Sequence, residues 1–231
     1  MKTTVKTTVK DVMTTRVIWV RQQASFKEMA AALRANRVSA FPVIDDQDKV
    51  IGVVSEADML AKAALAGEPG VFDSILHHRD QAKARGTTAG DLMTSPPVTV
   101  TPEDTIEHAA RLMYSHRVKR LPVVGAASRL AGVISRSDVL AVFDRPDGEI
   151  HDEITRDLIR DEFLCDPAAF TVTVADGVVT LSGRPETSEV GHQIVDRARH
   201  VPGGVAIRDR RSYPPAEHSG SVWGPAAHLA D

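Results

Sequence analysis

The sequence predicts a mixed α+β (α/β mixed) fold of three units, and two observations carry the prediction. Residues 11–60 return as residues 91–140 at a constant offset of 80, with fourteen identical residues among the fifty aligned positions. After residue 143 the apolar pattern changes to that of a helix, a hairpin, a second helix and a last strand. We therefore expect two β-α-β-β-α repeats that share one pseudo-twofold module, followed by a small α-β-β-α-β domain.

Each repeat begins with a short apolar run, at 17–20 or 98–100, and continues with a helix that has one apolar face. Ser25 and Glu28 have the spacing of a capping box at the start of the first of these helices, and Thr105 caps the second. Two strands then follow in each copy, at 40–44 and 50–55 in the first and at 121–124 and 130–135 in the second.

The third unit is expected to begin with an amphipathic helix over 153–164. The alternating runs 170–174 and 178–183, joined by the turn-forming pair Asp176 and Gly177, predict a β-hairpin. A second helix ends before Pro202, and residues 205–211 predict the last strand.

Composition and charge exclude several classes of protein. The chain has 28 basic and 31 acidic residues and a net charge of −3, so we expect no general binding to nucleic acid or to an anionic membrane. A single cysteine, Cys165, forms no internal disulfide and no thiolate pair for zinc. The sequence has neither a signal-like apolar segment at its start nor 18 consecutive apolar residues, which leads us to expect a cytoplasmic protein.

A Ser-x-x-Asp set occurs at the start of each closing helix, as Ser55 with Asp58 and as Ser135 with Asp138. Both side chains point to one side of a helix N-terminus, where a carboxylate accepts from ribose hydroxyls while the hydroxyl and the amides donate to phosphate. The structural alternative is that the serines are N-caps and that the aspartates favour the helix dipole. The spacing alone favours the structural alternative.

The first repeat has Asp-Val-Met-Thr before its first strand, Arg-Val-Ser-Ala-Phe-Pro-Val-Ile-Asp around the second and Gly-Val-Val-Ser-Glu-Ala-Asp after the third. With this combination of motifs the repeats resemble CBS domains, and the tandem pair resembles a Bateman module over about residues 8–143. This resemblance implies a regulatory module that binds an adenosine compound and uses the acidic position of Ser-x-x-Asp for ribose. The third unit, with its Asp-Gly-Val-Val-Thr-Leu-Ser-Gly hairpin, resembles a BON domain over about residues 149–212.

The expected boundaries are 8–66 for CBS motif 1, 67–87 for an inter-repeat linker or helix, 88–143 for CBS motif 2, 144–150 for a linker, 151–212 for the BON domain and 213–231 for a disordered tail.

The CBS resemblance implies two clefts, each built from both motifs. The main site that it implies consists of Arg16, Ile18, Val38, Ser39, Lys119, Arg120, Ser135 and Asp138. The second and weaker site consists of Pro96, Val98, Val118, Lys119, Ser39, Ala40, Ser55 and Asp58. Because the adjacent cations Lys119 and Arg120 belong together only to the main set, the cleft of Asp138 is predicted to bear the phosphate, and its counterpart to be empty or to take an unphosphorylated adenosyl compound. Without the resemblance, residues 116–120 are a solvated basic surface.

No catalytic or metal-ligating constellation is present in the sequence, which favours a non-catalytic sensor. The resemblance implies no required cofactor, a regulatory ligand of the AMP, ADP or ATP class or S-adenosylmethionine, and a homodimer formed through the CBS modules. The ligand is expected to change the packing of the two motifs, and the BON domain or a protein partner is expected to respond to that change. The alternative is a scaffold or envelope-associated stress protein, in which the BON domain contacts phospholipid and the CBS clefts are vestigial.

Overall fold

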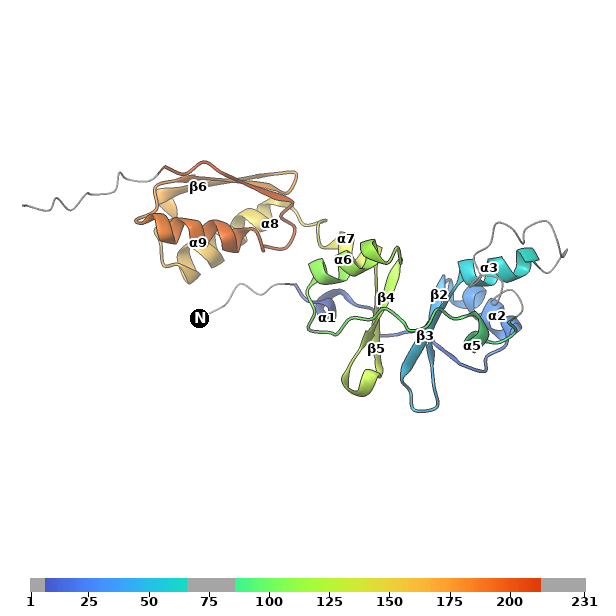
Figure 1. The fold of residues 1–231 in the computed structure, drawn as a ribbon. Coiled ribbons are helices and arrows are strands. Elements are labelled where there is room, and N and C mark those ends of the chain that lie inside the picture. The colour runs from blue at the N-terminus through green and yellow to red at the C-terminus, as the bar shows by residue number, and fades with distance from the viewer. Residues whose placement is uncertain (1–6, 66–85, 213–231) are drawn as a thin grey trace, which may run out of the picture. The chain divides into compact units, whose positions relative to one another are not determined.

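A computed structural model describes residues 7–65 and 86–212, which form two units with a boundary between Asp144 and Arg145 (Figure 1). The first unit contains both repeats, and the second contains the third predicted domain. The predicted tail 213–231 and most of the inter-repeat segment 67–87 lie outside the described residues.

The first repeat has the predicted order of helices and strands. Its elements are α1 (Val9–Val12), β1 (Val20–Arg21), α2 (Phe26–Asn36), β2 (Ala40–Ile44), β3 (Val50–Ser55) and α3 (Glu56–Leu65). In the sheet β1 is parallel to β2, and β2 is antiparallel to β3 with Pro42 opposite Val53. The capping box of α2 is confirmed, since the backbone N–H of Ser25 donates to Glu28 Oε2 at 2.7 Å.

The second repeat reproduces this order and register except for its first strand, because the predicted run 98–100 contributes only an isolated parallel bridge between Val100 and Val123. Its elements are α5 (Ala89–Leu92), α6 (Ile106–Ser115), β4 (Arg120–Val124), the 3₁₀ turn η1 (Ala126–Ser128), β5 (Leu130–Ser135) and α7 (Arg136–Ala141). Strands β4 and β5 are antiparallel with Pro122 opposite Val133, at the positions that Pro42 and Val53 occupy in the first repeat. Thr105 caps α6 as predicted, because its Oγ1 accepts from the N–H of His108 at 3.2 Å.

The leading helix of each repeat packs on the other repeat. Thr14, which follows α1, exchanges two backbone hydrogen bonds of 2.9 Å with Val133 of β5. Thr94, which follows α5, exchanges bonds of 2.8 and 3.2 Å with Val53 of β3. The two apolar cores show the same exchange, since Val9 is buried with the second repeat and Leu92 with the first. Neither repeat therefore completes its core without a segment of the other.

The third unit is a three-stranded sheet with helices. Its elements are α8 (Asp147–Asp152), the π-helix η2 (Glu153–Glu162), the 3₁₀ turn η3 (Pro167–Ala169), β6 (Phe170–Ala175), β7 (Val178–Gly183), α9 (Ser188–Ala198) and β8 (Ala206–Asp209). The strand order is β6-β7-β8, with the predicted hairpin antiparallel and β8 parallel to β7. Asp176 and Gly177 have φ values of 51° and 72°, as a two-residue hairpin turn requires. The first helix begins at Asp147, within the segment 144–150 that the sequence assigns to a linker.

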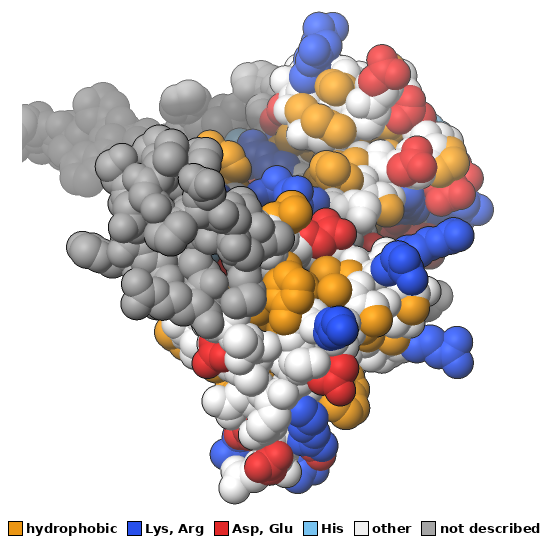
Figure 2. All heavy atoms as spheres, turned by 90° about the vertical axis from the view of Figure 1, so that its right-hand side faces the viewer, with side chains coloured by type: hydrophobic (Ala, Val, Ile, Leu, Met, Phe, Trp, Pro, Cys, Tyr) orange, Lys and Arg blue, Asp and Glu red, His pale blue; other side chains and the backbone are white. Residues whose placement is uncertain are grey.

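Charged side chains of both signs are interspersed on the face that Figure 2 shows, where no large block of one charge is visible among the described residues. This distribution agrees with the net charge of −3. Polar contacts on this face are therefore local rather than part of one large charged surface.

Candidate functional site

The two Ser-x-x-Asp sets form the same capping geometry in both repeats. Asp58 Oδ2 accepts from the backbone N–H of Ser55 at 2.9 Å and from its hydroxyl at 2.6 Å. Asp138 Oδ2 accepts from the N–H and the hydroxyl of Ser135, both at 2.7 Å. The structural alternative of N-capping is thus correct for both serines. Capping does not exclude ribose recognition, because a carboxylate offers about four lone-pair sites.

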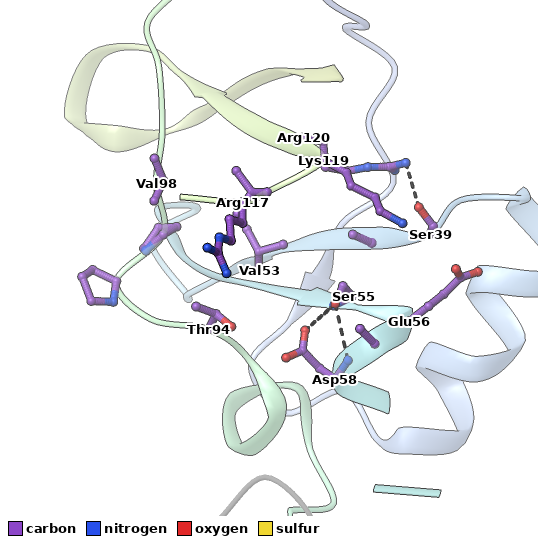
Figure 3. A pocket seen from close by; sticks show the side chains of 15 residues that line it. Ser39, Val53, Ser55, Glu56, Asp58, Thr94, Val98, Arg117, Lys119 and Arg120 are labelled. Atoms are coloured by element: carbon purple, nitrogen blue, oxygen red, sulfur yellow. Dashed lines mark hydrogen bonds between the residues drawn. The ribbon is translucent and has the colours of Figure 1, made fainter. Parts of the chain in front are cut away.

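A cavity of about 280 Å³ opens beside Ser55 and Asp58 (Figure 3). All eight residues of the predicted second site line it. The lining also contains seven residues that the sequence analysis did not assign to this site. Arg120 was assigned to the main site, and the other six were assigned to neither site: Val53, Glu56, Ala57, Thr94, Pro97 and Arg117.

Packing between the repeats creates this cavity. Because Thr94 pairs with Val53, the residues that follow Thr94 are held next to β3 of the first repeat, and Pro96 and Val98 become part of the wall. The opposite wall comes from the approach to β4, where Arg117 has the left-handed backbone conformation with a φ of 54°. The wall formed by Pro96 and Val98 therefore depends on the exchange of leading segments between the repeats.

The cavity brings together charges of both signs. Three cations, Arg117, Lys119 and Arg120, face a lining that also contains the carboxylates of Glu56 and Asp58. Arg120 Nη2 donates to Ser39 Oγ at 2.8 Å, which joins the second repeat to the first. Apolar residues such as Val53 and Val98 complete the lining. A site with apolar walls and a few charged groups suits a small polar ligand that has a flat apolar part.

The residues of the predicted main site are only partly brought together by contacts. Ser135 and Asp138 form their capping box, and Ser39 and Arg120 form their hydrogen bond. Lys119 and Arg120, which carried the assignment of phosphate to that site, line the cavity of Asp58. The remaining members, Arg16, Ile18 and Val38, are not among the residues of that lining. Which of the two clefts binds phosphate therefore remains a prediction.

Two of the lining residues that the sequence analysis missed, Arg117 and Glu56, have features in the sequence that could have identified them. Arg117 belongs to the Arg-Val pair that recurs from Arg37, and the duplication of this pair marks the approach to the second strand in both copies. Glu56 directly follows Ser55, whereas the same position of the second repeat is Arg136. Thr94 and Pro97 become lining residues only through the exchange of leading segments.

Within 7–65 and 86–212 there is no group of three or more His, Cys, Asp or Glu side chains that would hold a metal ion. Burial raises the pKa of the Cys165 thiol, and Glu186 raises it further, so this cysteine is mainly protonated at neutral pH. None of the described helices is long and apolar enough to cross a membrane.

Family models match both repeats and the third unit. The model of the CBS domain matches residues 9–64 and 89–145, and the model of the BON domain matches residues 146–213. The tandem pair and the domain behind it are thus confirmed, and neither match indicates a catalytic family.

Two curated relatives come from Arabidopsis thaliana. The chloroplastic CBS domain-containing protein CBSX1 is 32% identical over 133 residues, which are 52% of this chain and 56% of the relative. The chloroplastic CBSX2 is 33% identical over 147 residues, which are 58% of this chain and 62% of the relative. The alignments thus span less than two thirds of the length of either relative.

Two solved structures have the fold of the first unit. The crystal structure of CBSX2 in complex with AMP is 34% identical, covers 58% of this chain and 94% of its own, and gives a TM-score of 0.51. A CBS domain pair crystallised with methylthioadenosine and S-adenosylmethionine is 21% identical, covers 61% and 98%, and gives a TM-score of 0.50. The mixed α+β fold of the paired repeats is confirmed by these likenesses.

Proposed function

Since the chain belongs to the family of tandem CBS-domain proteins and has a BON domain behind the pair, we propose that it is a non-catalytic sensor of an adenosine compound. The ligand, of the AMP, ADP or ATP class or S-adenosylmethionine, binds between the two motifs. The observation that carries the proposal is the cavity of about 280 Å³ beside Asp58, whose lining comes from both repeats. The relative CBSX2, 34% identical, was crystallised with AMP.

The chemistry of the lining suits the parts of such a ligand. The Asp58 carboxylate accepts hydrogen bonds from the ribose hydroxyls, and the apolar wall around Val53 and Val98 contacts the base. Arg117, Lys119 and Arg120 supply donors to a phosphate, and charge-assisted hydrogen bonds of this kind are about twice as strong as neutral ones.

Binding between the repeats provides a route for regulation. A phosphate that accepts a hydrogen bond from Arg120 shares with Ser39 a guanidinium that has five N–H donors, and it draws that guanidinium toward the ligand. Occupancy therefore changes a contact that joins the two repeats, and the ligand favours whichever packing of the repeats binds it better. The BON domain or a protein partner then responds to that change.

Isothermal titration calorimetry of the full chain with AMP, ADP, ATP and S-adenosylmethionine tests the proposal. Asp58→Asn and Asp138→Asn form a matched pair, because asparagine keeps an acceptor oxygen for the N–H and hydroxyl of the capping serine and lacks the charge. We expect Asp58→Asn to weaken binding by about tenfold or more, as loss of about 1.5–3 kcal/mol from hydrogen bonds to a charged group implies. Loss of affinity in Asp138→Asn alone would favour the ranking predicted from the sequence. Absence of binding by all four compounds would overturn the proposed function.

Two further features belong to the same proposal. The homodimer that the CBS resemblance implies is tested by light scattering after size-exclusion chromatography, where a monomeric mass would contradict it. The alternative role of the BON domain at phospholipid is tested by flotation with anionic vesicles. Flotation of the full chain without any adenosine binding would favour the scaffold function over the sensor.

A further inference from the structure

The carboxylate of Glu56 occupies a place in the cavity that has no acidic counterpart in the other repeat. Position 56 aligns with Arg136 at the offset of 80. Arg136 donates from Nε to the backbone carbonyl of Val118 at 3.0 Å, and it is not part of the cavity lining. Glu56, by contrast, is exposed and lines the cavity of Asp58. Two otherwise equivalent helix starts therefore present opposite charges.

Figure 3 shows where this carboxylate lies. Glu56 is at the same end of the cavity as Lys119 and Ser39, to which Arg120 is bonded. Arg117 lies toward the other end, near Val53 and Thr94. A phosphate held by Lys119 and Arg120 is therefore expected on the Glu56 side of the cavity, and a chain of phosphates extended in that direction approaches the Glu56 carboxylate.

The charge and the volume of the cavity both limit the number of phosphate groups on the ligand. Three cations and two carboxylates line the cavity, so its net charge is +1 at neutral pH. Each phosphoryl group beyond the first adds about one negative charge to the ligand, and that charge meets Glu56 without a further cation in the lining. The volume of about 280 Å³ is also at the small end of ligand cavities.

We infer that Glu56 is a specificity-determining residue, which restricts the cavity of Asp58 to adenosine compounds with at most one phosphate. This inference rests on the proposed function, since it needs an adenosine ligand at this site. Glu56 disfavours ADP and ATP by electrostatic repulsion and affects adenosine and AMP little. Because Glu56 is exposed, salt screens part of the repulsion, so we expect a discrimination of about five- to tenfold from this one residue.

Calorimetric titration in magnesium-free buffer tests this inference. The measurement uses the full chain carrying Asp138→Asn, so that binding at the cavity of Asp58 is isolated, and compares AMP with ATP. We expect AMP to bind more tightly than ATP in this background. Glu56→Gln is expected to reduce the ratio of the two dissociation constants by about five- to tenfold, chiefly through tighter binding of ATP. Glu107→Gln, on the exposed face of α6 and outside the cavity lining, makes the same change of charge and should leave the ratio within about twofold.

The outcomes separate this inference from the proposed function. An unchanged ratio in Glu56→Gln, or ATP binding more tightly than AMP while Glu56 is present, overturns the role of Glu56 and leaves the sensor function intact. Failure of AMP to bind the Asp138→Asn protein overturns this inference, and failure of AMP, ADP, ATP and S-adenosylmethionine to bind the wild type overturns the proposed function as well. Raising the salt concentration should shrink the ratio in the Glu56 protein and not in Glu56→Gln, which identifies the effect as electrostatic.

Discussion

Met13 lies so close to Gly132 that a Cβ atom on the glycine would be 2.8 Å from the methionine sulfur and 3.0 Å from the carbonyl oxygen of Thr14. Met93 makes the equivalent contact with Gly52. These contacts explain why the Asp-x-Met-Thr and Gly-Val motifs both recur, since the methionine of one repeat packs on the glycine of the other. The approach also brings Thr14 and Thr94 into hydrogen-bonding distance of the partner strands.

Gly132→Ala is expected to destabilise the paired repeats by about 1–3 kcal/mol, because the added methyl group overpacks the contact with Met13. Gly125→Ala is the matched control, since the nearest atom to its Cβ is 4.0 Å away. Calorimetric unfolding measures both variants. Equal transition temperatures for the two variants would contradict the close packing at Gly132.

Asp147→Ala is expected to destabilise the third unit by about 1–3 kcal/mol, as the loss of hydrogen bonds to a charged group predicts. The Asp147 carboxylate at the start of α8 accepts from the backbone N–H groups of Asp176 and Gly177, both at 2.8 Å, and so holds the hairpin turn. Hydrogen exchange of the hairpin 170–183 measures the effect. Asp152→Ala, which removes an exposed ion pair with Arg156, should leave the exchange nearly unchanged.

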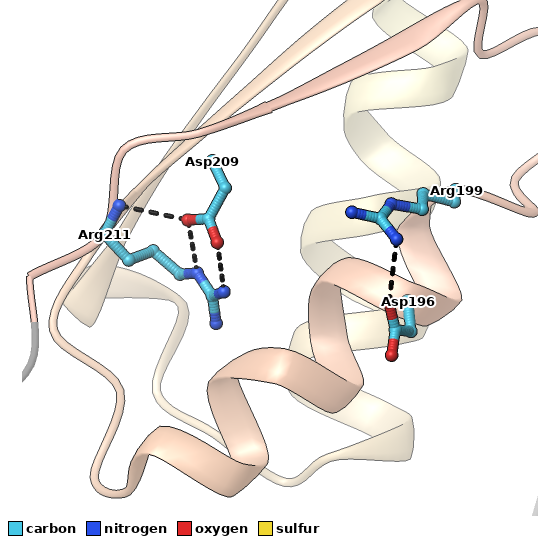
Figure 4. A network of polar contacts seen from close by, with 4 residues as sticks. All are labelled: Asp196, Arg199, Asp209 and Arg211. Carbon is cyan, nitrogen blue, oxygen red and sulfur yellow. Dashed lines mark hydrogen bonds and ion pairs between the residues drawn. The ribbon is translucent and has the colours of Figure 1, made fainter.

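Figure 4 shows two ion pairs of the third unit, and we expect their removal to lower the free energy of unfolding by different amounts. The Arg211 guanidinium is fully buried and binds both carboxylate oxygens of Asp209, whereas the side chain of Arg199 is 59% exposed where it meets Asp196 at 3.1 Å. We expect Arg211→Ala to cost about 1–3 kcal/mol and Arg199→Ala less than about 1 kcal/mol. Equal shifts of the calorimetric transition would show that burial does not set the strength of these pairs.

The stability of the third unit should also fall in acid through Asp209. The hydrogen bond from the side chain of Arg211 lowers the pKa of Asp209 below its ordinary value of 3.8. A lowered carboxyl pKa stabilises the folded state above the unfolded pKa, and this contribution is lost as the pH falls through the folded pKa. We expect the wild type to lose stability from about pH 5 downward, and Asp209→Asn and Arg211→Ala to have a shallower slope. Parallel slopes for all three proteins in calorimetric unfolding would contradict this assignment.

Features that depend on residues close together in the chain were predicted from the sequence. The capping box of Ser25 with Glu28 and the hairpin turn at Asp176 are correct, because they rest on spacing and on local backbone preferences. The strands 40–44, 50–55 and 130–135 also have the predicted bounds. By contrast, the predicted run 17–20 forms only the short strand β1, Val20–Arg21. Its bounds differ because only Val20 and Arg21 pair with the parallel strand β2.

The sequence by itself determined that the chain is duplicated, which elements each copy contains, and that a different domain follows. It also indicated that the Ser-x-x-Asp sets, Lys119 and Arg120 belong to a binding region, although the role of each remains a prediction. Only the tertiary structure decided which repeat each leading segment completes, and with that which cleft contains Arg117, Glu56 and Arg120. The physical reason is that local periodicity specifies helices and strands, whereas the walls of the cavity come from contacts such as Thr94 with Val53, between residues far apart in the chain.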